Sequence, residues 1–337
     1  MKVLIIRRDN IGDLILTTPL IATIARETGS KVDLLVNTYN KPVLDNNPHV
    51  GKVFLYSKLH HRSKGTSALS VLWQRLKTII DLRRARYDVA IVAKERWDKR
   101  PLQWAKLAGA KKIIAIGNDC PPEVTDALPE STQNEHLVKL LARLAEPLGI
   151  TAEPGPLELY VRPEETAAIK QKINLPDDGL PVYGLQISSR RPEQRWPVEN
   201  FVVLAQRLAA QQPCHILLFW SPGSADNKLH PGDDEKAHYI IDNCQGVSLL
   251  PVVTENIREL MAGMSLCDRI VTSDGGALHI AAGVHKPIVA LFGNKAAWLW
   301  TPWAVPHELL QGEGYDVRNI PVDEVYNAFI RLQEQRK

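Results

Sequence analysis

Two turns in this chain place glycine beside aspartate directly after a strand-like stretch, and both could bind or transform a charged ligand. The first follows residues 3–6 and contains Gly12-Asp13. The second follows residues 269–272 and reads Asp274-Gly275-Gly276. In open α/β sheets, ligands bind beyond the carboxyl ends of the strands. We therefore predict two half-sites, one in each of two domains, that face a common cleft.

The second turn is suited to a nucleotide diphosphate. A helix N-terminus offers unpaired N–H groups and a partial positive charge, and glycine lets the backbone approach a phosphate closely. Gly275 and Gly276 precede a helix-like run, residues 277–283, in which His279 lies one turn from the start. The same pattern is also consistent with Asp274 as an ordinary helix N-cap and with His279 as a packed structural residue.

A basic loop between a predicted strand and a predicted helix could neutralise the same diphosphate. Guanidinium groups bind phosphate oxygens through two hydrogen bonds at once. The candidate side chains of residues 186–197 are Ser188, Ser189, Arg190, Arg191 and Arg195. Arg191 also fits a solvated surface loop. A further glycine loop, residues 219–227, follows the next strand and contains Trp220 and Asp226.

Asp13 is the candidate general base. In general base catalysis, a side chain takes the proton of a substrate hydroxyl as that hydroxyl reacts. A carboxylate at the cleft can do this if it lies within hydrogen-bond reach of that hydroxyl. Asp9, in the same turn, is a second candidate, and the local sequence fits Asp13 equally well as an N-cap.

The charge pattern predicts an anionic partner for the N-terminal half. Residues 46–80 contain six lysines and arginines and no acidic residue, although the net charge of the whole chain is only +3. The densest part, residues 57–65, contains Lys58, Arg62 and Lys64. These side chains could bind an anionic acceptor, or could dock the protein on anionic lipid at about 1 kcal/mol per residue. A charge run of this kind also fits a solvated loop without a ligand.

The elements that must position these residues alternate between strands and helices. Such alternation is typical of a parallel sheet covered by helices, so we predict an α/β fold. The alternation pauses at the proline-rich residues 152–156, which are the best candidate for a domain boundary. The predicted domains are residues 1–155 and 156–320, followed by a C-terminal helix in residues 321–337.

Length and composition fit two domains and exclude several classes of protein. The chain has 337 residues, is 45% hydrophobic and is nearly balanced in charge, which gives no case for nucleic acid. Its four cysteines form no CxxC motif or Cys/His cluster, so we expect no metal site and no cofactor. The apolar residues 3–6 are too short for a signal peptide, and no apolar run approaches the roughly 20 residues of a membrane span. We expect a cytoplasmic protein with at most peripheral membrane contact.

Four segments, in this order, resemble the heptosyltransferase family of sugar-nucleotide glycosyltransferases, glycosyltransferase family 9, which extends the inner core of lipopolysaccharide. They are the Gly12-Asp13 turn with Thr17-Thr18-Pro19, Arg195-Trp196-Pro197, the run from Asp274 to His279, and Pro287 with Phe292-Gly293. The resemblance implies the GT-B architecture, in which two Rossmann-like domains face a central cleft. It also implies that the last helix returns to the N-terminal domain.

The resemblance implies transfer of heptose from ADP-heptose to an anionic, lipid-linked saccharide of the lipopolysaccharide core, with Asp13 as the base. The basic loop would contact Kdo carboxylates and lipid A phosphates. The implied acceptor-binding residues are Gly12, Lys58, Arg62 and Lys64. The implied donor-binding residues are Ser188, Ser189, Arg190, Trp220, Asp226, Asp274, Gly275, Gly276 and His279, with the region of Trp220 and Asp226 at the nucleoside.

Two positions depart from the family pattern. Gln194 stands where a lysine commonly steadies the leaving diphosphate, so Arg195 or Arg190 must supply the charge. Gly275 stands where the family has a threonine, so a hydroxyl contact to phosphate is absent. Both departures are compatible with a nucleotide-sugar or lipid-binding module that lacks turnover. A sugar-nucleotide epimerase of the same fold is the other alternative, whereas the absence of GxGxxG in the first turn disfavours a dehydrogenase.

Overall fold

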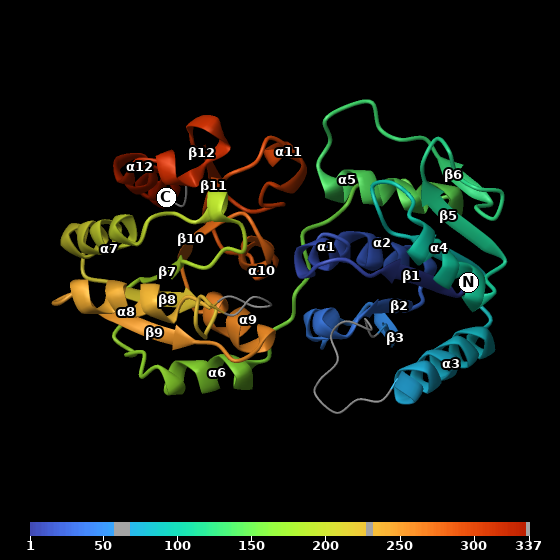
Figure 1. The fold of residues 1–337 in the computed structure, drawn as a ribbon, viewed down its shortest axis with the longest axis horizontal. Coiled ribbons are helices and arrows are strands. Elements are labelled where there is room, and N and C mark those ends of the chain that lie inside the picture. Colours follow the sequence, from blue (N-terminus) through green and yellow to red (C-terminus); the bar gives the residue numbers. More distant parts are fainter. Residues whose placement is uncertain (57–67, 227–231, 335–337) are drawn as a thin grey trace. The chain divides into compact units, whose positions relative to one another are not determined.

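The chain divides into two compact units, Met1–Leu159 and Tyr160–Lys337. The computed structural model describes residues 1–56, 68–226 and 232–334. Each unit is built on a six-stranded sheet with helices packed against it (Figure 1). The predicted α/β class is therefore confirmed in both halves of the chain.

The sheet of the first unit has the strand order β3-β2-β1-β4-β5-β6, and all its strand pairs are parallel. The central strand β1 is buried along its whole length, as expected for a parallel strand covered on both faces. The strands are β1 (Val3–Arg7), β2 (Val32–Asn37), β3 (Val50–Tyr56), β4 (Val89–Val92), β5 (Lys112–Ile116) and β6 (Asp126–Leu128). The helices are α1 (Ile11–Ile15), α2 (Thr18–Thr28), α3 (Ala68–Ala85), α4 (Lys99–Ala108) and α5 (Leu137–Ala142), with 3₁₀ turns at η1 (Thr38–Leu44) and η2 (Arg143–Leu148).

The sheet of the second unit has the order β12-β11-β10-β7-β8-β9 and is also parallel throughout. Its strands are β7 (Val182–Gln186), β8 (His215–Trp220), β9 (Leu249–Val253), β10 (Arg269–Ser273), β11 (Ile288–Phe292) and β12 (His307–Gln311). Its helices are α6 (Pro163–Lys172), α7 (Val198–Gln211), α8 (Asp234–Asn243), α9 (Ile257–Ser265), α10 (Gly276–Gly283), α11 (Ala297–Trp300) and α12 (Val322–Glu334), with 3₁₀ turns at η3 (Pro192–Gln194), η4 (Glu313–Tyr315) and η5 (Val317–Asn319).

Counted from the first strand of each unit, the two sheets have the same order. In each, the chain reverses its direction of travel across the sheet at the first strand, which is β1 in one unit and β7 in the other. Ligands bind at such switch points, beyond the carboxyl ends of the strands. The turns that follow β1, β7 and β10 are therefore the places where the fold exposes functional side chains.

Three strands were not anticipated from the sequence, and all of them lie at sheet edges. They are β3, β6 and β12. β6 has only three residues, none of them buried, and β12 is half-buried or exposed along its length. An edge strand is covered on fewer sides than a central one, so it lacks the continuous apolar run that reveals a buried parallel strand.

The last helix, α12, belongs to the core of the second unit. Its buried residues Val325, Ala328, Phe329 and Leu332 join the hydrophobic cluster that α7 and the second sheet form. The ring of Phe329 packs edge-on against Tyr183 of β7, with the ring centroids 4.8 Å apart. The apolar face of α12 is therefore buried within its own unit, and the expected return of this segment to the N-terminal domain stays a prediction.

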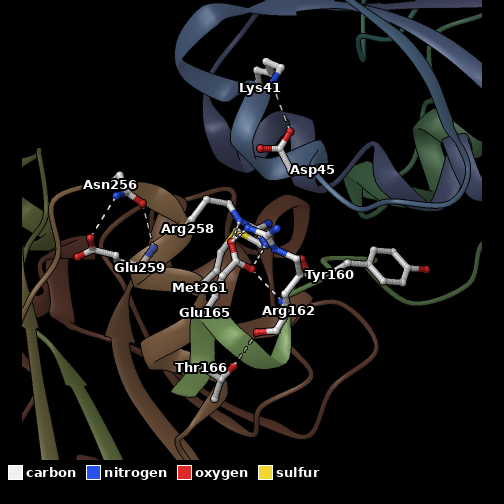
Figure 2. A network of polar contacts seen from close by, with 10 residues as sticks. All are labelled: Lys41, Asp45, Tyr160, Arg162, Glu165, Thr166, Asn256, Arg258, Glu259 and Met261. Atoms are coloured by element: carbon white, nitrogen blue, oxygen red, sulfur yellow. Dashed lines mark hydrogen bonds and ion pairs between the residues drawn. The ribbon is translucent and has the colours of Figure 1, made fainter. Parts of the chain in front are cut away.

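A network of polar contacts fixes the start of the second unit (Figure 2). Arg258 of α9 donates from Nε to the Glu165 carboxylate of α6 at 2.9 Å, and from Nη2 to the carbonyl oxygen of Tyr160 at 2.8 Å. The backbone N–H of Arg162 donates to the same carboxylate at 2.8 Å. These hydrogen bonds, the Arg258 guanidinium foremost, lower the pKa of Glu165 to about 2. The ion pair therefore ties α6 and the first residues of the unit to α9.

Replacement of Glu165 should make stability depend on pH in a defined window. Because the folded state lowers this pKa from 4.5 to about 2, the carboxylate stabilises the fold at pH values above 4.5 and loses this effect as the pH falls toward 2. We expect Glu165→Gln to lower the free energy of unfolding at pH 7 by on the order of 1–2 kcal/mol, after allowance for solvent screening. Urea unfolding from pH 7 down to pH 2 measures this difference.

The matched control for that experiment is Glu164→Gln, because Glu164 is the neighbouring exposed carboxylate on the same helix. It should leave the free energy of unfolding nearly unchanged at every pH. If the difference in unfolding free energy between the wild-type protein and Glu165→Gln stays constant down to pH 2, the lowered pKa of Glu165 is contradicted.

Candidate functional site

Asp13 is held by two hydrogen bonds at the carboxyl edge of the first sheet. It is the third residue of α1, only 8% exposed, and its Oδ2 accepts the backbone N–H of Asn10 at 2.8 Å. Its Oδ1 accepts Nη2 of Arg7 at 2.9 Å. Asn10 occupies the N-cap position. Asp13 is therefore not the N-cap that the sequence allowed, and its carboxylate has a fixed orientation.

Arg7 is the residue that organises this turn, and the sequence analysis did not single it out. Its guanidinium is 1% exposed and donates to the carbonyl oxygen of Ala93, which follows β4. Besides Asp13, it faces the carboxylates of Asp9, with Nε to Oδ2 at 3.6 Å, and Glu95, with Nη1 to Oε2 at 4.0 Å. A charged residue at the end of an otherwise apolar strand was the available signal, since buried charges require partners.

The structure describes two of the other residues predicted for this half-site, Asp9 and Gly12. Asp9, the alternative base, is already engaged by two cations, Arg7 and Lys94, the latter with Nζ to Oδ1 at 3.5 Å. Gly12 is buried in α1 directly before Asp13. The predicted acceptor-binding residues Lys58, Arg62 and Lys64 lie outside the described residues, and their role stays a prediction.

In the second unit, Asp274 follows β10 and its carboxylate is bound by two amides. Oδ2 accepts Nε2 of Gln194 at 2.7 Å and Nδ2 of Asn294 at 2.6 Å. Burial raises the pKa of Asp274, while the amide hydrogen bonds and the charge of Arg191 lower it. Gly275, not Asp274, occupies the N-cap of α10, with φ of 153°. A threonine would be strained at that φ, so glycine suits this position.

Gln194 connects Asp274 to the loop that follows β7. The Gln194 side chain is 6% exposed, and its Oε1 accepts the hydroxyl of Ser189 at 3.2 Å. The turn that carries Gln194 lies tightly against Gly293, where an added Cβ would stand 2.4 Å from the carbonyl oxygen of Glu193. Glycine at 293 thus permits this approach. The position at which the family commonly has a lysine is a neutral link in a buried network.

The arginines of the same loop differ in what their side chains contact. Arg195 donates from Nε to the carbonyl oxygen of Ser189 at 2.8 Å and from Nη2 to that of Arg190 at 3.1 Å. Its guanidinium therefore braces the backbone of the loop. Arg190 and Arg191 are both exposed, and the charge of Arg191 acts to lower the pKa of Asp274.

The residues predicted near the nucleoside differ in burial. Trp220 lies in the hydrophobic core at 6% exposure, and its indole N–H donates to the carboxylate of Asp234 at 2.7 Å. Ser188 accepts the backbone N–H of Ser221 at 2.7 Å, which joins the loops after β7 and β8. Asp226 is exposed on the loop after β8. The acidic partner of Trp220 is therefore Asp234, a residue for which the sequence pattern gave no signal, and the nucleoside contacts stay a prediction.

His279 lies on α10 at 3% exposure, with its ring centroid 6.3 Å from that of Trp300.

Within residues 1–56, 68–226 and 232–334, no three His, Cys, Asp or Glu side chains form a group that could hold a metal ion. None of the helices in that part of the chain is both long and apolar enough to cross a membrane.

Comparison with known proteins decides the family. The model of glycosyltransferase family 9 (heptosyltransferase) matches residues 75–315, which is well over half of the chain. The chain belongs to this family. The predicted family and the predicted class of enzyme, a glycosyltransferase, are confirmed.

Individual relatives agree with this assignment. The chain is 25% identical over 307 residues to lipopolysaccharide heptosyltransferase 3 of Escherichia coli K12, covering 87% of this chain and 82% of that protein. It is 26% identical over 311 residues to lipopolysaccharide heptosyltransferase 2 of the same strain, covering 88% and 84%. The structure of the E. coli heptosyltransferase WaaC with ADP has a TM-score of 0.79 and 17% identity, covering 98% of this chain and 100% of that one. The fold of two Rossmann-like domains is thus shared with a member of the family.

Replacing Arg7 should lower the free energy of unfolding more than replacing its buried partner Asp13. Arg7→Met leaves the Asp13 carboxylate buried without its cation, which should cost about 3–5 kcal/mol of unfolding free energy. Asp13→Asn leaves Arg7 with Asp9, Glu95 and the Ala93 carbonyl, so we expect less than half of that loss. Urea unfolding of the two variants measures the difference, with Arg84→Met, an exposed arginine of α3, as control.

An equal or larger loss in Asp13→Asn would mean that Arg7 depends on Asp13 alone and that the other two carboxylates contribute nothing.

Proposed function

We propose that this glycosyltransferase moves heptose from ADP-heptose to an anionic, lipid-linked saccharide of the lipopolysaccharide core, with inversion and with Asp13 as general base. The observation that carries the proposal is the orientation of the Asp13 carboxylate by Arg7 at the switch point of the first sheet. The names of the relatives, lipopolysaccharide heptosyltransferases 2 and 3, support the acceptor, and the ADP in the structure of a related enzyme supports the donor.

Asp13 has the features that a base in this reaction needs. One hydrogen bond on each carboxylate oxygen fixes its orientation and leaves a lone pair on each oxygen for the acceptor proton. In the proposed step, the acceptor hydroxyl gives its proton to Asp13 while its oxygen bonds to the anomeric carbon. The bond from that carbon to the diphosphate breaks, and ADP leaves with the electron pair. In this step Arg7 acts through Asp13 and is a positioning residue.

On the donor side, α10 and the loop after β7 would share the diphosphate. The glycines at 275 and 276 open the N-terminus of α10, whose free N–H groups suit an anion. Because Gln194 is neutral, the positive charge must come from arginines of the loop. Arg191 is the first candidate, since its charge acts on Asp274, whereas the guanidinium of Arg195 is bound to backbone carbonyls. The carboxylates of Kdo and the phosphates of lipid A would meet the basic segment with Lys58, Arg62 and Lys64.

Asp13→Asn should abolish most turnover without loss of donor binding. A lost general base costs roughly 10²-fold or more in kcat, whereas the dissociation constant of ADP should stay within about twofold because Asp13 belongs to the other unit. The assay follows ADP release with ADP-heptose and a deacylated lipopolysaccharide acceptor, and NMR of the product reports the anomeric configuration.

Unchanged kcat in Asp13→Asn would remove Asp13 from the mechanism. If the wild-type protein binds ADP-heptose and the acceptor but forms no product, the protein is a binding module and the proposed function is wrong.

Substitution by lysine should distinguish the roles of the loop arginines Arg195 and Arg191. If Arg195 acts by bracing the loop, Arg195→Ala and Arg195→Lys should both lower kcat/KM for ADP-heptose, because a single ammonium nitrogen does not reproduce the planar geometry in which Nε and Nη2 reach two carbonyls. If Arg191 acts through its charge, Arg191→Ala should raise the barrier by about 2–4 kcal/mol and Arg191→Lys should restore most of the rate.

Arg190→Ala is the matched comparison for both arginines. A loss with Arg190→Ala that exceeds the Arg191→Ala loss would transfer the charge role to Arg190, and full activity of Arg195→Lys would show that Arg195 acts as a charge.

A further inference from the structure

Arg8 is a buried arginine whose guanidinium has no acceptor in the described part of the chain. It follows β1 directly, next to Arg7, and is only 8% exposed. Its guanidinium carbon lies 3.9 Å from the ring centroid of Tyr56 at the end of β3. Its Nε is buried and makes no hydrogen bond. Burial lowers the pKa of Arg8, as expected for a cation whose desolvation is not offset by a bound anion.

The neighbouring Arg7 also has a buried Nε without a hydrogen bond, but its guanidinium is paired with Asp13 and donates to a backbone carbonyl. The carboxylates of Asp9 and Asp98, whose charges raise the pKa of Arg8, are both ion-paired with Lys94, at 3.5 and 3.2 Å. Within the described residues Arg8 contacts the Tyr56 ring but no anion, and a buried guanidinium is costly unless an anion offsets its desolvation.

A second arginine approaches the same tyrosine. Arg75 of α3 lies 5.3 Å from the Tyr56 ring centroid and donates from Nη2 to its hydroxyl at 3.1 Å. Its Nε is also buried without a hydrogen bond. Trp104 of α4 packs edge-on against the Tyr56 ring, with centroids 5.7 Å apart, and so helps to fix the ring. Arg8, Tyr56 and Arg75, here called the arginine stack, thus present two cations with unused donors at the end of β3 and β1.

We propose that the arginine stack binds an anionic group of the acceptor, a carboxylate or a phosphate, and thereby anchors the acceptor at the sheet edge that carries Asp13. Two guanidinium groups with free N–H donors suit either oxyanion. Arg8 and Asp13 belong to the same turn after β1, so an acceptor bound at Arg8 is held by the segment that also carries the base. The inference rests on the proposed function for the identity of the ligand, but not for the presence of the anion site.

The test measures binding of a deacylated lipopolysaccharide core oligosaccharide to the full chain by calorimetry, without donor. Charge-assisted hydrogen bonds are worth about 1.5–3 kcal/mol, so Arg8→Met should raise the dissociation constant about 10- to 100-fold. Arg75→Met should raise it by a smaller factor, because Arg75 keeps more solvent contact. Arg84→Met, an exposed arginine of the same helix α3, is the matched control and should leave it unchanged.

Two chemically altered oligosaccharides identify the anion. If the stack binds a carboxylate, the Arg8→Met difference disappears with the carboxyl-reduced oligosaccharide, and if it binds a phosphate, with the dephosphorylated one. An Arg8→Met difference that stays the same with both, or no difference with the intact oligosaccharide, overturns the proposal. Circular dichroism and ADP binding establish that each variant is folded, and Arg8→Lys serves in place of Arg8→Met if the latter is not.

A separate probe distinguishes failure of this inference from failure of the proposed function. If the wild-type protein does not bind the oligosaccharide, the proposed acceptor is wrong, and inorganic phosphate and acetate are then titrated against the Nε–H NMR signal of Arg8, assigned by its loss in Arg8→Lys. A saturable shift of that signal supports the anion site. A signal that neither anion shifts overturns it.

Discussion

The buried ion pair between Arg7 and Asp13 is the interaction on which the first half-site depends. It joins the last residue of the central strand to the short helix that follows, and it draws Asp9, Glu95 and the backbone after β4 around one guanidinium. Such a pair contributes little net stability compared with apolar packing, but loss of one member is costly. Its value here is orientation, because both oxygens of the candidate base are fixed before any acceptor binds.

The second half-site also lies at the end of a strand, but its aspartate has different hydrogen-bond partners from those of Asp13. Asp274 is bound by two neutral amides, those of Gln194 and Asn294. Burial raises the pKa of Asp274, and these amide hydrogen bonds and the charge of Arg191 act in the opposite direction. The positive charge is instead on the exposed arginines of the loop, whose backbone Arg195 holds in place. The tight contact at Gly293 fixes this loop against the end of β11.

Arg8 lies next to Arg7, but the two guanidinium groups have different surroundings. Arg7 and Arg8 are adjacent in sequence and both buried, yet Arg7 is paired with carboxylates and Arg8 is stacked on an aromatic ring. Neighbouring residues leaving a strand point in opposite directions, so the two side chains enter different environments. Arg7 thus orients Asp13, and Arg8 is the arginine for which we propose an anionic ligand.

The sequence by itself determined the α/β class, the central strands, the two glycine turns and the family, because buried parallel strands and strand-end turns leave continuous local patterns. It did not determine the edge strands β3, β6 and β12, which are too exposed to show such a run, or the packing of α12. Nor did it give the partners of Arg7, Arg8, Arg195 and Trp220. Those contacts were decided only by the tertiary structure, because most of the partners of these side chains lie on segments that are distant in the sequence or are set by the fold of a loop.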